Sequence, residues 1–429
     1  MLQADKKTAV RFFRMVCAPD ETEQVAALLR AEGFDFAPEG ISPWAFRLLA
    51  EPRPLGSSLA AFFGLIYIQD RSSMLPPLAL NPPPGATVLD MCASPGSKTG
   101  LLAQLVGRGG LVVGNEPNPV RLGTLRRNLE IANLLQTVTS KSAGEELKLG
   151  SGRWPYILLD PPCSGWGTVE RHPKVMKLWK GDKIKPLLNI QRDLLRRAAQ
   201  FLQPGGRLVY STCTTNSAEN EDQAAWACEA LGLHPEAFAW PDRAAGQETL
   251  VTSLHIAGGE GEGQGFFVAM FGKNEKSSAP PPAAPDESGK QEAWWAGYRE
   301  RLVPRELLSS ACLDADRLPP GEAAVFGDSL IFMPAGVAGL LPVQVNWRGF
   351  PLGKFSGGTA RPSPRLRALM RPAAHCPALD AEEPEIIRRL LSGNSLSLEV
   401  PGREAGLYFQ GLPLGLLRVR NGRAMWSEG

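Results

Sequence analysis

Continuous apolar runs alternate with amphipathic patterns through the middle of the chain. The apolar runs, rich in Val, Leu and Ile, lie at 87–92, 111–116, 156–162 and 206–213. Patterns with helical spacing fall between them, at 97–106, 118–133 and 187–202. Because a strand that is apolar at successive positions is buried on both faces, this alternation predicts βαβ units and a parallel sheet covered by helices on both sides.

The two ends of the chain differ from this middle part. Near the start, a helix is predicted around 21–31, ending at Gly33, and a hairpin through 57–70. A stretch rich in Pro, Ala and Ser at 272–290 cannot form a packed core and is typical of a linker. Short apolar runs beyond it predict compact β-rich modules. We expect four parts: an N-terminal α/β appendage (1–72), the main α/β domain (73–273), the linker (274–290) and a C-terminal region (291–429).

The composition is that of a soluble globular protein, with 43% hydrophobic and 21% charged residues. No apolar run approaches the roughly 20 residues needed to cross a bilayer, and the start lacks the apolar core of a signal peptide. We therefore expect a cytoplasmic protein with no membrane partner.

The seven cysteines are scattered, odd in number and never spaced as Cys-x-x-Cys. This pattern argues against a disulfide framework and against structural zinc. With only four histidines, the chain offers few further metal ligands. We predict reduced thiols and no metal site.

The net charge of +2 says little, but the charges are unevenly distributed. Residues 171–197 hold nine Lys or Arg against two acids, and residues 329–379 hold six against none. Either stretch alone could be a solvated surface. Together they point to a polyanionic partner.

A loop of small residues follows the first strand of the predicted sheet, and a helix follows the loop. In an open parallel sheet, ligands bind at the carboxyl ends of the strands, and small side chains let backbone amides approach them. The loop lacks the spacing of a Walker loop and of Gly-x-Gly-x-x-Gly, which argues against nucleoside triphosphates and dinucleotides. Glu116 ends the next strand. It could bind a ribose, or it could be an ordinary solvated residue at the end of a strand.

Two cysteines follow buried strands at this same edge. Cys163 comes after Asp160 and two prolines, and Cys213 directly follows another apolar run. A lone cysteine in such a place is most often a small buried hydrophobe. Two of them near an aspartate, at one edge of one sheet, favour a catalytic site.

Four motifs, in this order, resemble the NOL1/NOP2/Sun family of RNA 5-methylcytosine methyltransferases. They are DMCASPGSKT, LLDPPCSGWGTVERHP, QRDLLRRAAQFLQPGGRLVYSTCT and NSAENED, and the similarity runs from Ile68 to Met270. The resemblance implies the Rossmann-like class I fold of S-adenosylmethionine-dependent methyltransferases. That fold has a seven-stranded sheet with one antiparallel edge strand, for which 265–272 is the candidate. S-adenosylmethionine is the implied cofactor and RNA the implied substrate.

The resemblance also implies roles for individual residues. Cys213 would add to C6 of cytosine and so make C5 nucleophilic, and Cys163 would help to release the product. Asp160 would hold the base and protonate N3, with Lys98 orienting it. The implied S-adenosylmethionine-binding residues are Cys92, Ala93, Ser94, Pro95, Gly96, Ser97, Lys98, Glu116, Arg121 and Asp160. Ser142 stands where the family usually has an adenine-contacting aspartate, so we expect backbone groups or Ser142 to hold adenine.

The region beyond the linker resembles the PUA-like RNA-binding extension of the family's bacterial ribosomal RNA branch, at 379–400 and 411–424. We expect a monomeric enzyme that methylates small-subunit ribosomal RNA on an unpaired or flipped cytosine. The basic run after Cys163 would bind RNA backbone, and Trp166 and Trp179 would either stack on bases or pack internally. The alternatives are methylation of transfer RNA, methylation of an adenine amino group, and a role in ribosome assembly without catalysis.

Overall fold

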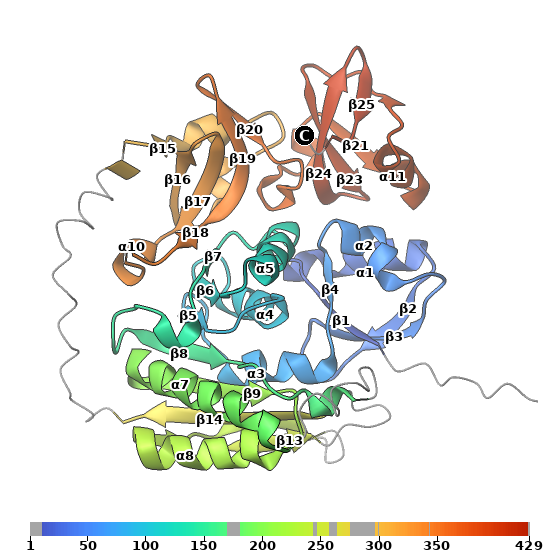
Figure 1. Cartoon of the computed structure of the whole chain (residues 1–429). Helices are drawn as coiled ribbons and strands as arrows, with labels where there is room; N and C mark the ends of the chain where they lie inside the picture. The colour runs from blue at the N-terminus through green and yellow to red at the C-terminus, as the bar shows by residue number, and fades with distance from the viewer. Residues whose placement is uncertain are drawn as a thin grey trace, which may run out of the picture.

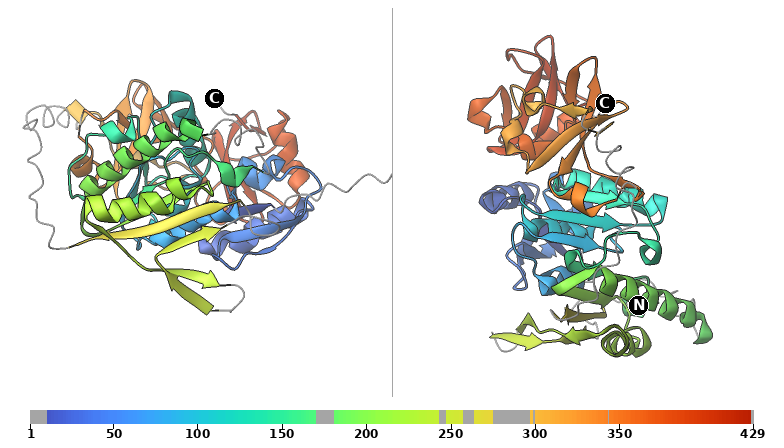
Figure 2. Two further views of the ribbon diagram at one scale, coloured as in Figure 1. Left: turned by 60° about the horizontal axis from the view of Figure 1, so that its bottom comes forward. Right: turned by 90° about the vertical axis from the view of Figure 1, so that its left-hand side faces the viewer.

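The computed structural model describes residues 11–169, 181–242, 247–256, 264–274, 297–298, 300–342 and 344–427. Figure 1 and Figure 2 show a layered α/β part, N-terminal elements beside it, and two C-terminal β-sheets stacked above both. Most of the predicted linker, 275–290, lies outside the described residues. Within the described part, no helix is long and apolar enough to cross a membrane.

A nine-stranded sheet lies at the centre. Its strands are β5 (Thr87–Asp90), β6 (Leu111–Asn115), β7 (Thr137–Ser140), β8 (Trp154–Leu159), β9 (Leu202–Thr212), β10 (Leu233–Pro235), β13 (Ser253–Ile256), β14 (Phe266–Lys273) and β18 (Trp347–Arg348). Their order is β10-β14-β9-β8-β5-β6-β7-β18, with β13 also paired to β14. The pairs from β7 to β9 are all parallel, which confirms the predicted Rossmann-like methyltransferase sheet.

Helices cover both faces of this sheet. They are α3 (Arg71–Leu80), α4 (Ser97–Val106), α5 (Pro119–Ile131), α7 (Lys185–Phe201) and α8 (Glu221–Leu231). Val88 and Val112 lie in the same buried cluster as side chains of α3, α4 and α5. Their neighbours Leu89 and Val113 lie in the cluster that contains α7 and α8. Successive strand residues thus face opposite cores, which is why the strands are apolar throughout.

Strand β14 differs in one respect from the sequence prediction. It is antiparallel to β9, as expected of the segment 265–272, but it is not an edge strand. Both β10 and β13 pair with it on its other side. The physical reason is its composition: seven of its eight residues are buried, so an open edge would leave an apolar strand facing water. A separate hairpin of β11 (Phe238–Asp242) and β12 (Gln247–Val251) lies nearby in sequence.

The N-terminal part is a four-stranded sheet, ordered β2-β3-β1-β4, with two helices. Its elements are β1 (Phe12–Met15), α1 (Thr22–Ala31), β2 (Asp35–Pro38), β3 (Ala45–Ala50), α2 (Leu59–Phe62) and β4 (Ile66–Ile68). The helix ending near Gly33 is confirmed. The hairpin predicted at 57–70 is wrong, because Ser58 caps α2 by accepting from the Ala61 amide and β4 then pairs with β1.

The C-terminal region contains two five-stranded sheets, which confirms its β-rich character. The first comprises β15 (Leu302–Val303), β16 (Gly321–Phe326), β17 (Ser329–Pro334), β19 (Phe350–Ser356) and β20 (Thr359–Pro362), near the short helix α10 (Val337–Leu340). The second comprises β21 (Ala378–Ala381), β22 (Leu396–Ser397), β23 (Glu404–Phe409), β24 (Leu412–Arg420) and β25 (Arg423–Met425), with helix α11 (Pro384–Leu391).

The second C-terminal sheet shares a core with the N-terminal part. One buried cluster joins Phe13 and Leu28 to Ile387 and Leu407. The guanidinium of the buried Arg367 donates to the Val16 carbonyl at 2.6 Å and to the Gly64 carbonyl. The N-terminal part and the second C-terminal sheet are therefore packed against each other, and α3 runs unbroken across the predicted border at residue 72.

Candidate active site

Two thiols meet at the carboxyl end of the parallel strands. Cys163 lies in the loop after β8, and Cys213 directly follows β9. Their sulfur atoms are 3.1 Å apart. Neighbouring parallel strands bring their following loops to the same edge, so two residues 50 positions apart in sequence become partners.

The two thiols have unequal acidities. The hydrogen bond from Cys163 lowers the pKa of Cys213, against the effects of burial and of the Asp160 charge. The same hydrogen bond, together with burial, raises the pKa of Cys163 well above its usual value. These opposite directions favour Cys213 as the thiolate, which is the nucleophilic form of a cysteine, and Cys163 as the hydrogen-bond donor.

A partly buried ion pair stands beside the thiols. Lys98, in the first turn of α4, donates from Nζ to Asp160 Oδ2 at 2.6 Å. Ser211 Oγ donates to the other carboxylate oxygen at 2.9 Å. Burial acts to lower the pKa of Lys98, but the charge and hydrogen bond of Asp160 outweigh it and the pKa is raised. Lys98 therefore stays protonated and hydrogen-bonded to Asp160.

A second carboxylate, Glu219, ties the two cysteine loops together. It is fully buried and accepts from the Ser164 amide at 2.9 Å and from the Ser164 hydroxyl at 2.5 Å. Gln191 of α7 donates to the same carboxylate at 3.0 Å and to the Pro162 carbonyl at 2.9 Å. Sequence reasoning gave Glu219 no role; its only sequence signal was an acid within the motif that follows Cys213.

Gly167 provides a close backbone contact between the same loops. Its amide donates to the Cys213 carbonyl at 3.1 Å, and its carbonyl accepts from the Gly265 amide at 3.0 Å. A Cβ atom at this position would lie 2.1 Å from the Gly265 carbonyl oxygen. Only glycine fits, because the backbone of Cys213 and the chain entering β14 both approach it.

The small-residue loop lies between β5 and α4, as the sequence predicted. The Ala93 amide donates to the Asn115 carbonyl at 2.9 Å, and Asn128 of α5 donates to the Pro95 carbonyl at 2.7 Å. Ser94 and Arg121 exchange hydrogen bonds through their backbone carbonyls, at 3.0 and 3.2 Å. The loop is thus held mainly by its backbone.

Arg14 supports this loop from the N-terminal part, which sequence reasoning did not foresee. Its guanidinium is buried, donates to the Ser97 carbonyl at 3.2 Å and to the Gln69 amide oxygen at 3.0 Å, and also contacts Gln104. It lies 5.3 Å from the ring of Tyr67. A Cβ on Gly100 would be 2.6 Å from this guanidinium, so α4 packs directly against it.

Part of the basic run after Cys163 lies outside the described residues, including Trp179. In the described part, Arg192 and Arg196 lie over the ring of Trp226, at 5.2 and 5.0 Å. These cations of α7 therefore pack on α8. Trp166 is half-buried, and its indole N–H has no hydrogen-bond partner among the described residues.

Comparison with known proteins identifies the family. The family described as 16S rRNA methyltransferase RsmB/F matches residues 77–272. The ribosomal RNA small subunit methyltransferase F of Shewanella amazonensis is 31% identical over 415 residues, which cover 92% of this chain and 86% of that protein. The chain belongs to the RsmB/F family. It is thus an S-adenosylmethionine-dependent RNA methyltransferase, as the motifs predicted.

Further relatives of this RsmB/F chain match a little more than half of it. The protein of the same name from Pectobacterium atrosepticum is 37% identical over 255 residues, covering 56% of this chain and 51% of that protein. A solved structure of a methyltransferase homolog from Pyrococcus horikoshii is 33% identical, with a TM-score of 0.52, covering 62% of this chain and 88% of that one.

The residues of this RsmB/F chain fit S-adenosylmethionine. Glu116 is 2% exposed and directly follows β6, near the small-residue loop. Its carboxylate would accept hydrogen bonds from a ribose diol there. Gly96 has a φ of +105°, and a Cβ there would be 3.1 Å from Leu125. Arg121 lies 3.4 Å from the Glu116 carboxylate. Among the residues that the structure describes, no group of His, Cys, Asp and Glu could hold a metal ion.

Ser142 takes the position where the family usually has an aspartate that contacts adenine. The Ser142 hydroxyl donates to the Ala143 carbonyl at 3.1 Å, so it is engaged within its own loop. Asn115 donates to the Ser142 carbonyl at 2.9 Å and to the Met91 carbonyl at 3.2 Å. Asn115, at the end of β6, thus sets the backbone of both loops that border this end of the site.

Proposed function

We propose that the protein methylates C5 of a cytosine in small-subunit (16S) ribosomal RNA through a transient covalent adduct between Cys213 and C6 of the base. The observation that carries the proposal is the pair of thiols 3.1 Å apart, with the hydrogen bond from Cys163 favouring the thiolate of Cys213. An enzyme that methylates an exocyclic amine or a hydroxyl does not need such a nucleophile.

Addition to C6 is the first step. The Cys213 thiolate forms the S–C6 bond, and the displaced electron pair is drawn toward N3, which takes a proton. The Lys98–Asp160 pair, with its 2.6 Å hydrogen bond, supplies a proton at this position. The resulting electron-rich C5 is then a competent nucleophile. S-adenosylmethionine, when bound, supplies the methyl group.

Release reverses the addition. The proton on C5 leaves to water, its electron pair restores the C5–C6 double bond, and the S–C6 bond breaks with sulfur departing as a thiolate. N3 returns its proton to the Lys98–Asp160 pair, which leaves neutral 5-methylcytosine. Cys163 stabilises this departing thiolate by the hydrogen bond that it donates to Cys213. A thiolate of lowered pKa is also a better leaving group, so one hydrogen bond serves both the attack and the release.

The substrate assignment rests on the relatives. The RsmB/F relatives from Shewanella and Pectobacterium are named as ribosomal RNA small subunit methyltransferases. We infer that this chain also modifies small-subunit ribosomal RNA, with the N-terminal part (1–72) and the C-terminal region (291–429) contacting the RNA around a flipped-out cytosine.

Bisulfite mapping of ribosomal and transfer RNA, from cells with and without the protein, tests this proposal. The expected result is one or a few cytosines in small-subunit ribosomal RNA that lose protection when the protein is absent. Protection lost only in transfer RNA would contradict the substrate. Methylation in vitro at a position other than C5 would contradict the chemistry.

A further inference from the structure

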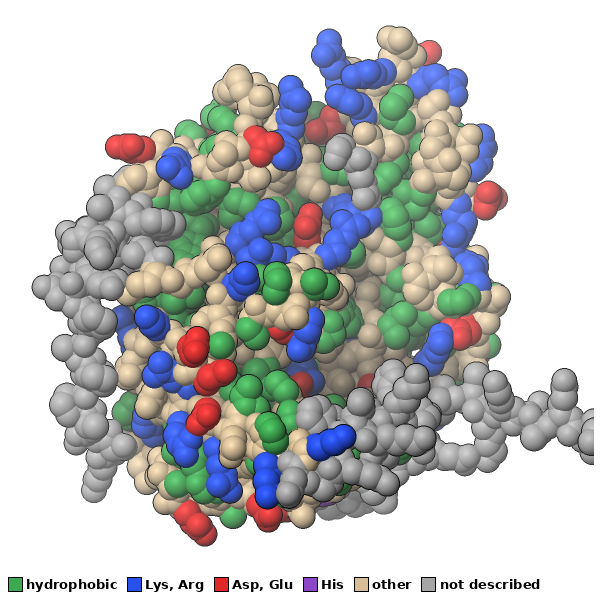
Figure 3. Space-filling view, in the orientation of Figure 1, with side chains coloured by type: hydrophobic (Ala, Val, Ile, Leu, Met, Phe, Trp, Pro, Cys, Tyr) green, Lys and Arg blue, Asp and Glu red, His purple; other side chains and the backbone are tan. Residues whose placement is uncertain are grey.

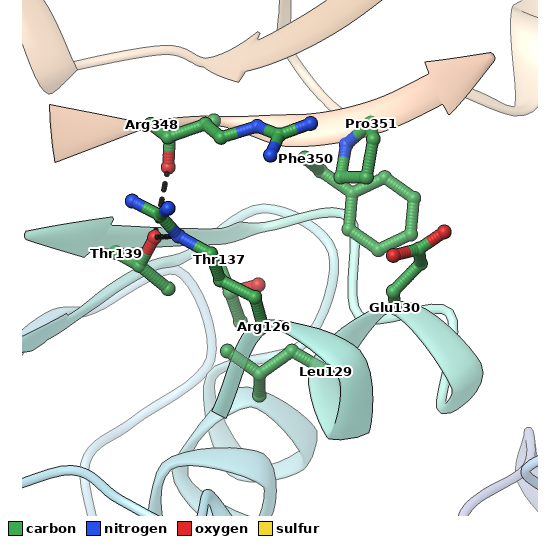
Figure 4. Close-up of a pocket in the computed structure, with 9 residues that line it drawn as sticks. Arg126, Leu129, Glu130, Thr137, Thr139, Arg348, Phe350 and Pro351 are labelled. Carbon is green, nitrogen blue, oxygen red and sulfur yellow. Dashed lines mark hydrogen bonds between the residues drawn. The ribbon is translucent and has the colours of Figure 1, made fainter. Parts of the chain in front are cut away.

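A pocket opens at the seam between the catalytic sheet and the first C-terminal sheet, where β18 joins the edge of β7 (Figure 4). Arg126 enters it from α5 and Arg348 from β18, with Thr139 of β7 and Phe350 of β19 also in the lining. None of these residues belongs to the thiol site or to the small-residue loop. The pocket is built by two parts of the chain that are far apart in sequence.

Neither arginine has an ion-pair partner among the residues that the structure describes. Arg126 Nε donates to the Thr139 hydroxyl at 2.9 Å, and that hydroxyl donates to the Arg348 carbonyl at 3.4 Å. Glu130 also lines the pocket. Burial and then the charge of Arg348 lower the pKa of Arg126. An anion bound between the two guanidinium groups would relieve the repulsion between them.

The surroundings of the pocket are also basic. Figure 3 shows Lys and Arg side chains gathered along the seam between α5 and the C-terminal sheets. The pocket itself joins a cation of α5 to a cation of β18, so its two charges come from two structural parts. A site that bridges two parts of the chain in this way matches an extended polyanion better than a small free anion.

We propose that Arg126 and Arg348 hold a backbone phosphate of the RNA substrate at this seam. The inference rests on the proposed function, since the RNA is the one that delivers its cytosine to Cys213. In the sheet, β7 lies four strands from β9, the strand that precedes Cys213, or about 19 Å at about 4.8 Å per strand. A nucleic-acid strand that rises about 3.4 Å per nucleotide covers this distance in about six nucleotides.

The test compares the double variant Arg126→Gln/Arg348→Gln with the matched control Arg127→Gln, which removes an exposed charge of the same helix outside the pocket. The probe is purified small-subunit ribosomal RNA, with Kd measured at several salt concentrations. We expect the double variant to bind about tenfold more weakly, with the slope of log affinity against log salt reduced by about 1 to 2. Its methylation rate at saturating RNA should be unchanged.

A second variant, Arg126→Lys/Arg348→Lys, keeps both charges and should keep the salt slope of the wild type. Thermal melting of every variant checks that the fold is retained. If the double glutamine variant bound RNA as tightly as Arg127→Gln, the proposed phosphate site would be wrong and the methylation proposal would stand. Wild-type protein that binds the RNA but fails to methylate it would overturn the proposed function alone. No RNA binding by the wild type would overturn both.

Discussion

The base side and the cofactor side of this site are held in different ways. At the base side, side chains hold one another: thiol on thiol, and Lys98 on Asp160. At the cofactor side, the loop 92–97 is held through its backbone carbonyls, by Asn128 and by Arg14 from the N-terminal part. The contrast separates two kinds of effect. Substitutions at the base side should change the rate of reaction, and those at the cofactor side should change how tightly S-adenosylmethionine binds.

The largest expected effect lies at the thiol pair. Cys213→Ala should reduce methylation by about four or more orders of magnitude, because the neighbouring thiol of Cys163 has a raised pKa and stays protonated. Cys163→Ala should instead accumulate a covalent protein–RNA adduct that survives a denaturing gel, because addition still occurs and release is impaired. The double variant, which has no nucleophile, is the control for the gel. Absence of an adduct in Cys163→Ala would contradict the two-thiol mechanism.

The acidity of Cys213 gives a test that needs neither RNA nor cofactor. The hydrogen bond from Cys163 lowers the pKa of Cys213, so removing it in Cys163→Ala should raise that pKa. Alkylation requires the thiolate, and its rate should therefore begin to rise at a higher pH in the variant. Iodoacetamide labelling of the Cys213 peptide, followed by mass spectrometry over a pH series, measures this shift.

If the pKa of Cys213 fell in Cys163→Ala, the thiol–thiol hydrogen bond would not be what holds the base side together. The contrast between the base side and the cofactor side would then not hold. Cys228, which lies on α8 away from both thiols in sequence, offers an internal control in the same samples. Its labelling profile should be the same in the wild type and in Cys163→Ala, because burial and the charge of Glu229 raise its pKa.

The base side could be predicted from sequence to a large extent, and the cofactor side less so. Cys163 and Cys213 each follow an apolar run, and parallel strands necessarily present their following loops at one edge. Arg14 gave no such signal, because its bond to the Ser97 carbonyl spans 83 positions and depends on how the N-terminal sheet docks on α4. Glu219 is intermediate: its motif was visible, but its bonds to Ser164 arise only when two loops are packed together.

Glu219 tests whether the base side also depends on the packing beneath it. Glu219→Gln removes one of the acceptors that hold Ser164 and should cost about 1 to 3 kcal/mol of unfolding free energy, with a fall in kcat and little change in the KM for S-adenosylmethionine. Denaturant unfolding and steady-state kinetics measure both. Glu221→Gln is the control: its half-exposed ion pair with His255 should contribute less than about 1 kcal/mol. Equal effects of the two substitutions would argue against the role of Glu219.

Arg14 offers the smallest effect and the sharpest test of the cofactor side. Arg14→Lys keeps the charge but loses the forked geometry that reaches the Ser97 carbonyl and Gln69 together. The loop before α4 should then be less well ordered, and the KM for S-adenosylmethionine should rise about three- to tenfold while kcat and the Kd for RNA stay close to wild type. Calorimetric titration with S-adenosylmethionine, beside the kinetics, measures this. A fall in kcat at an unchanged KM would mean that the N-terminal part supports the base side, and the contrast between the two sides would not hold.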